Sequence, residues 1–94
     1  MPWTAHVPTT NGSRYLQQLC KHWSHKFETS FDAERGTIAL PMGLVELVAT
    51  PDALTVTLEP QPDADVAKFK QVVAEHLDRF AFREAPLPFD WVAS

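Results

Sequence analysis

The stretch LVELVATPDALTVTLE, residues 44–59, decides the fold. Its second half, residues 53–59, alternates apolar and polar side chains, which is the period of a half-buried strand. Its first half, residues 44–49, reads as another strand, with apolar residues on both faces. Only Thr50, Pro51 and Asp52 separate the two, so the connection is a short turn. The two strands are therefore predicted to be antiparallel neighbours.

Further strands extend this hairpin on both sides. Residues 27–31 alternate in the same way, and residues 37–40 return after a hairpin loop at 32–36. We expect Gly36 to close that loop with a positive φ. Residues 3–7 form a short N-terminal strand, and residues 89–92 add a last strand at an edge.

Two amphipathic segments lie among the strands and are predicted to be helices, because their apolar residues recur every three or four positions. These residues are Leu16, Leu19, Cys20, Trp23 and Phe27 in the first helix, and Val66, Phe69, Val73, Leu77 and Phe80 in the second. Thr9 or Ser13 is expected to cap the first helix. Asp63 is expected to cap the second, which runs to about residue 82.

The predicted fold class is α+β, with one domain over residues 1–94. The order is β-α-β4-α followed by a short tail. Each helix must bury one apolar stripe, and the simplest arrangement places both helices on one face of the sheet. We therefore predict a two-layer sandwich with an antiparallel sheet.

Composition excludes several function classes. A net charge of −4 argues against nucleic acid as the main partner, because neutralising phosphates needs a basic surface. The sequence has no apolar run long enough for a membrane span and no N-terminal signal pattern. Its single cysteine, Cys20, cannot form an internal disulfide, which fits a reducing compartment. A cytoplasmic protein is the expectation.

Positive charge is concentrated in residues 13–27, which contain no acidic residue. Arg14, Lys21 and His25 share the solvent side of the first helix, with His22 and Lys26 on its flank. Such a face is suited to a carboxylate, a phosphate or an acidic protein partner. The alternative is a solvated helix face that pairs with acidic neighbours.

The same segment holds Cys20, His22 and His25, which raises the question of a metal site. Zinc needs three or four converging ligands. Cys20 points into the core, so the candidates are His22, His25 and, from the second helix, His76. The alternative is a core cysteine beside two solvated histidines, and no cofactor is firmly predicted.

A second polar segment ends the second helix. His76 falls within the apolar stripe, where it either bonds within the core or lines a pocket with Arg79 at the rim. Arg83 and Glu84 follow, and they read equally well as a surface pair. Because His22 and His76 flank adjacent stripes, we predict that they meet across the seam between the helices.

The two polar segments together, with Gly36, Pro41 and Gly43 between them, resemble the bacterial domain of unknown function 2218 over nearly the whole chain. The resemblance matches a set of motif positions that comprises Arg14, Cys20, Lys21, His22, His25, Lys26, His76, Arg79 and Arg83. It implies little about function. Members of the family occur beside siderophore-interacting proteins, which implies a link to iron metabolism.

Three function classes follow from these observations. The first is a small ligand-binding or accessory module, and the ligand-binding set is Arg14, Lys21, His22, His25, Lys26, His76, Arg79 and Arg83. The second is an interaction or oligomerisation domain, and a homodimer is expected because residues 44–48 are apolar on both strand faces. The third, an enzyme, is disfavoured because no nucleophile constellation or Gly-rich phosphate loop is visible.

Overall fold

The structure, a computed structural model, describes residues 2–93. In chain order its elements are β1 (Trp3–Pro8), α1 (Gly12–Trp23), β2 (Thr29–Phe31), β3 (Arg35–Leu40), β4 (Gly43–Ala49), β5 (Ala53–Pro60), α2 (Val66–Phe80) and β6 (Val92–Ala93). The predicted β-α-β4-α order is confirmed. Neither helix within the described residues has the length and apolar character needed to cross a membrane.

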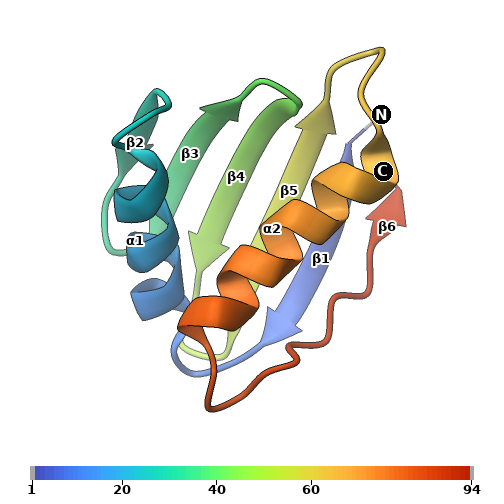
Figure 1. The fold of residues 1–94 in the computed structure, drawn as a ribbon. Coiled ribbons are helices and arrows are strands. Elements are labelled where there is room, and N and C mark those ends of the chain that lie inside the picture. Colours follow the sequence, from blue (N-terminus) through green and yellow to red (C-terminus); the bar gives the residue numbers. More distant parts are fainter. Residues whose placement is uncertain (1, 94) are drawn as a thin grey trace.

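The strands form one antiparallel sheet in the order β2-β3-β4-β5-β1-β6 (Figure 1). Its centre is the predicted hairpin of β4 and β5, in which Leu47 pairs with Val56 and Val45 with Leu58. This register places the apolar residues of both strands on the same face. The predicted last strand is shorter than expected: β6 covers two residues and pairs with Trp3 and Thr4 of β1.

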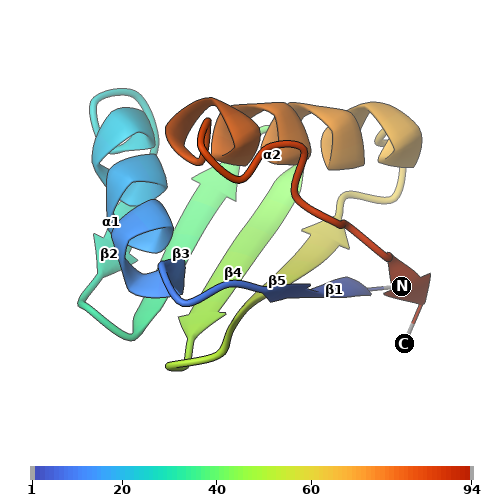
Figure 2. The same ribbon diagram turned by 90° about the horizontal axis from the view of Figure 1, so that it is seen from below.

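Both helices lie on one face of the sheet, as predicted, and leave the other face uncovered (Figure 2). The core is a single cluster between the two layers, built from the inward residues of β1, β3, β4 and β5 and the apolar stripes of the helices. Phe69, Val73 and Leu77 of α2 and Leu16 and Leu19 of α1 are fully buried in it. Burial of these side chains is the dominant stabilising term of the fold.

The bounds of α1 differ from the prediction. Its N-cap is Asn11, not Thr9 or Ser13, and the helix ends at Trp23, before His25, Lys26 and Phe27. Phe27 still packs on the core, although it lies in the turn that leads to β2. Tyr15, which was not among the predicted apolar residues of this helix, is buried.

The bounds of α2 also differ. Asp65, not Asp63, is the N-cap, and its carboxylate accepts a hydrogen bond from the Lys68 amide at 3.1 Å. The helix ends at Phe80, so Phe82 lies in the turn beyond it. Arg83 and Glu84 therefore lie in a non-helical turn, close to the start of α1.

Two glycines occupy strand positions where another residue would not fit. Gly36 was predicted in a loop with positive φ, but it is a buried residue of β3 without positive φ. A Cβ there would lie 2.7 Å from the Cys20 Sγ, so glycine is needed for the close approach of α1. Gly43 alone among the described glycines has a positive φ, 151°, where β4 begins.

Candidate functional site

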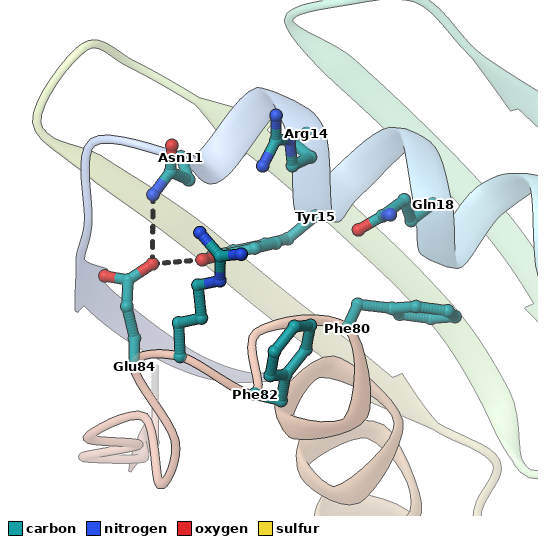
Figure 3. A pocket seen from close by; sticks show the side chains of 8 residues that line it. Asn11, Arg14, Tyr15, Gln18, Phe80, Phe82 and Glu84 are labelled. Atoms are coloured by element: carbon teal, nitrogen blue, oxygen red, sulfur yellow. Dashed lines mark hydrogen bonds between the residues drawn. The ribbon is translucent and has the colours of Figure 1, made fainter.

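A cleft of about 540 Å³ opens where the start of α1 meets the turn after α2 (Figure 3). Its lining combines two arginines, one carboxylate, two amides, a phenol and two phenyl rings. These are Arg14, Arg83, Glu84, Asn11, Gln18, Tyr15, Phe80 and Phe82. Segments nearly 70 residues apart in the chain thus build one site, as the contact between Tyr15 and Glu84 illustrates.

Glu84 is the anchor of this site. Its carboxylate accepts hydrogen bonds from the Tyr15 hydroxyl, from the Asn11 Nδ2 at 3.2 Å and from the Thr9 hydroxyl at 3.0 Å. These three donors, led by Tyr15 and then Asn11, hold the pKa of Glu84 below its usual range. The carboxylate is therefore ionised at neutral pH and its oxygens are already occupied.

Tyr15 is the buried partner in this network. The Tyr15 side chain extends from α1 with its ring buried in the core, and its hydroxyl contacts Glu84 at the wall of the cleft. Burial raises the pKa of Tyr15, and the hydrogen bond to the Glu84 carboxylate raises it further. The hydroxyl therefore keeps its proton and remains a donor to Glu84.

The two arginines of the cleft come from different elements. Arg14 stands in the first turn of α1, and Arg83 lies in the turn after α2. Within residues 2–93, no carboxylate lies within 4.0 Å of either guanidinium. The Arg83 guanidinium lies 5.7 Å from the centre of the Phe82 ring, and that ring is 71% exposed. Both cations are free to bind a solute.

A histidine pair lies further along the same helix seam. The His22 and His76 rings are 5.5 Å apart between centroids, which confirms the predicted meeting across the seam. Trp23 flanks His76 at 4.8 Å, and Phe80 flanks His22 at 5.9 Å. His76 Nδ1 lies 2.7 Å from the Val72 carbonyl oxygen, which can only accept, so Nδ1 carries the proton and Nε2 remains free.

Comparison with known proteins places the chain in a family. A family model described as "Uncharacterized protein conserved in bacteria (DUF2218)" matches residues 4–92. The chain belongs to this family. The solution NMR structure of PA4090 from Pseudomonas aeruginosa is similar to it, with 41% sequence identity and a TM-score of 0.78. The match covers 97% of this chain and 94% of that one. No curated protein matches.

The other predicted site residues of this DUF2218 member lie outside the cleft. Lys21 is exposed in the last turn of α1, and His25 and Lys26 are exposed in the turn that follows. Arg79 is exposed on α2, close enough to His22 to influence its pKa. The single cationic face expected on the first helix is therefore divided, with Arg14 at one end of the seam and His22 near the other.

The predicted metal candidates do not assemble in this DUF2218 member. Across the described part of the chain, no three His, Cys, Asp or Glu side chains form a group that could hold a metal ion. His25 lies beyond the end of α1, so it does not share a helix face with His22. Cys20 is buried, and burial raises the pKa of its thiol to about 11, which keeps it a protonated core residue.

Sequence reasoning assigned only Arg14 and Arg83 of the cleft to a binding site. It missed the other six lining residues: Asn11, Tyr15, Gln18, Phe80, Phe82 and Glu84. A signal for Tyr15 existed, since it lies four residues before Leu19 and eight before Trp23 on the apolar side of the helix. No local pattern could pair Tyr15 with Glu84, because they are 69 residues apart.

Proposed function

We propose that this protein is a small-molecule binding module that holds an anionic group, a carboxylate or a phosphate, in the cleft between Arg14 and Arg83. One observation carries the proposal: two guanidiniums line one cleft without an ion pair, while its carboxylate, Glu84, is occupied by three donors. Guanidinium is the side chain best suited to bidentate binding of carboxylate and phosphate.

The remaining lining fits an organic anion with an apolar part. Gln18 supplies an amide beside Arg14, and Phe80 and Phe82 supply aromatic surface on the side of α2. A largely exposed ring such as Phe82 gains from being covered by an apolar ligand. An iron chelator that carries carboxylates would be one member of this ligand class, which keeps the proposal compatible with a role in iron metabolism.

The test is a titration of the 15N-labelled protein with citrate and with inorganic phosphate, followed by NMR. Binding should move the signals of Arg14, Gln18 and Arg83. Arg14→Gln and Arg83→Gln should each weaken binding roughly tenfold, the loss expected for one charged hydrogen-bonding group.

Arg35→Gln is the matched control, because Arg35 is an exposed arginine on β3 outside the cleft. It removes the same charge and should leave the affinity nearly unchanged. Equal losses in all three variants would mean that only the overall charge attracts the anion. Shifts confined to other residues would refute the cleft as the site.

A second candidate function is assembly of two copies. It is favoured by the uncovered face of the sheet, where Val48 is 36% exposed and no element of the described chain packs. This function does not compete for the cleft, which lies on the helical side of the sheet. The two can therefore be tested separately.

A further inference from the structure

The histidine pair neighbours the cleft along the seam between α1 and α2. Arg14, Gln18 and His22 follow one another at intervals of four residues, so they lie on the same side of α1. Phe80 of α2 lines the cleft and also contacts the His22 ring at 5.9 Å. Because eight helical residues rise about 12 Å, Arg14 and His22 are about that far apart along the seam between the two helices.

The histidine end of this seam is lined by basic residues, and His22 there is open to solvent. His22 is exposed, and neither of its ring nitrogens has a hydrogen-bond partner among residues 2–93. The charged groups that act on it are Arg79 and His76 from α2 and His25 and Lys26 from the turn after α1. All four are basic, and no carboxylate of the described residues acts on this ring.

Resting on the proposed function, we infer that His22, His76 and Arg79 form a second anion subsite, and that the ligand class is an elongated molecule with an anionic group at each end. One end binds between Arg14 and Arg83. The other end lies beside the Arg79 guanidinium and accepts a hydrogen bond from the His22 ring when that ring is protonated, and the His76 ring packs next to it. The middle of the ligand lies against Phe80 and the Gln18 amide.

This arrangement makes the second subsite sensitive to pH. His22 is exposed overall, but the neighbouring groups partly desolvate its ring, and this desolvation, followed by the charges of His76, Arg79, His25 and Lys26, lowers the pKa of His22. The free protein therefore keeps this ring neutral at neutral pH and charges it only in acid. An anion placed beside it stabilises the imidazolium, so ligand binding and protonation must promote each other.

The experiment compares three simple acids by calorimetry and NMR on the full chain. Sebacate is a long α,ω-dicarboxylate that can reach from Arg14 to the histidine pair. Succinate has two carboxylates but is too short, and octanoate has a comparable chain but one carboxylate. Sebacate should bind roughly tenfold tighter than either, the gain expected for one added charged contact. It should also raise the pKa of His22, read from the ring proton shifts.

His22→Gln should remove the advantage of sebacate while leaving succinate binding intact. His6→Gln is the matched control, since His6 is an exposed histidine on β1, whose side chain bonds to Thr55 on the other face of the sheet. It should change neither. Because His22 is exposed, its replacement tests the contact without removing core packing.

Two outcomes would overturn the inference, and they are distinguishable. If all three acids bind at Arg14 with equal affinity and His22 does not respond, the second subsite is refuted and the proposed function stands. If none of them moves the Arg14 and Arg83 signals, the proposed function fails, and the two-ended ligand fails with it.

Discussion

At the scale of single residues, Glu84 determines the shape of the cleft. Its carboxylate joins the loop before α1, through Thr9 and Asn11, to the helix itself, through Tyr15. Because Arg83 is its neighbour in the chain, the same contacts place the second guanidinium opposite the first turn of α1. Glu84 is thus exposed to solvent, yet its hydrogen bonds hold its side chain in one position.

Glu84→Gln should destabilise the protein in a way that depends on pH. The folded state holds the pKa of Glu84 below its ordinary value of 4.5, so the ionised form is favoured by folding. The contribution to stability is therefore fully present above about pH 4.5 and is lost as the pH falls through the lowered value. Urea unfolding at about pH 7 and about pH 3 should show a gap between wild type and variant that shrinks in acid.

Tyr15→Phe tests the same contact from the other side and should cost about 1 kcal/mol at neutral pH. Glu59→Gln is the control, because Glu59 is an exposed glutamate on β5, and it should alter stability by less than about 0.5 kcal/mol. A gap between wild type and Glu84→Gln that stays constant with pH would contradict the role of the carboxylate.

At the scale of elements, the periodicity of the sequence predicted the buried faces of the helices and strands. It did not predict the conformation of the turns that connect them. The apolar stripes of both helices, except for Phe27 beyond the end of α1, and the alternation of β5 were correct, because burial on one face requires those spacings. The meeting of His22 and His76 followed from the same spacings. The cleft could not follow from them, since Arg83 and Glu84 leave from a turn whose direction no period encodes.

The N-caps of the two helices also differ from what local sequence patterns predict. Asn11 occupies the N-cap position of α1, but its amide donates to Glu84, and the helix has no side-chain cap bond. A tertiary contact has therefore replaced a local one, which a local pattern cannot reveal. At α2 the turn uses more residues than expected, because Gln61 and Ala64 form their own backbone bonds before the helix begins.

Asp65→Ala should therefore destabilise the protein by about 1 kcal/mol, the usual cost of losing an N-cap. The reason is the bond from the Lys68 amide to the Asp65 carboxylate, which alanine cannot accept. Thermal or urea unfolding measures it. Asp63→Ala removes the same charge two residues earlier and should have little effect. If Asp63→Ala proved the more damaging of the two, the helix would begin earlier than the structure has it.

At the scale of the whole molecule, the two faces of the sheet are chemically different. The helical face carries the core, whereas the other face carries a row of polar residues that crosses the strands, formed by Thr4, Thr57, Glu46, Thr37 and Ser30. The apolar residues 44–48 expose less than their pattern suggested, because Val45 and Leu47 are buried and Leu44 is half-buried. Val48 is the exposed member.

The C-terminal tail does not cover this face. Phe89 and Trp91 stack on each other at 5.7 Å and pack against the core, and β6 pairs with β1 at the edge of the sheet. The tail therefore widens the sheet. A second subunit is therefore the cover of this face that is still to be tested.

The final prediction is a homodimer that pairs the uncovered faces around Val48. Light scattering coupled to size exclusion should give twice the mass of 10.6 kDa at high micromolar concentration. Val48→Glu should return the protein to a monomer without unfolding it, since a charge at the centre of a two-fold interface meets its own copy. Val92→Glu, which changes an exposed valine on the edge strand β6, is the matched control and should leave the dimer intact.

A monomer mass for the wild-type chain would refute the dimer. An antiparallel sheet can keep one face in water when that face is polar enough. The row of polar residues on this face would then make the face polar enough to stay exposed to water, with Val48 included. The protein would act as a single binding module, with its cleft on the covered side and no surface reserved for a second copy.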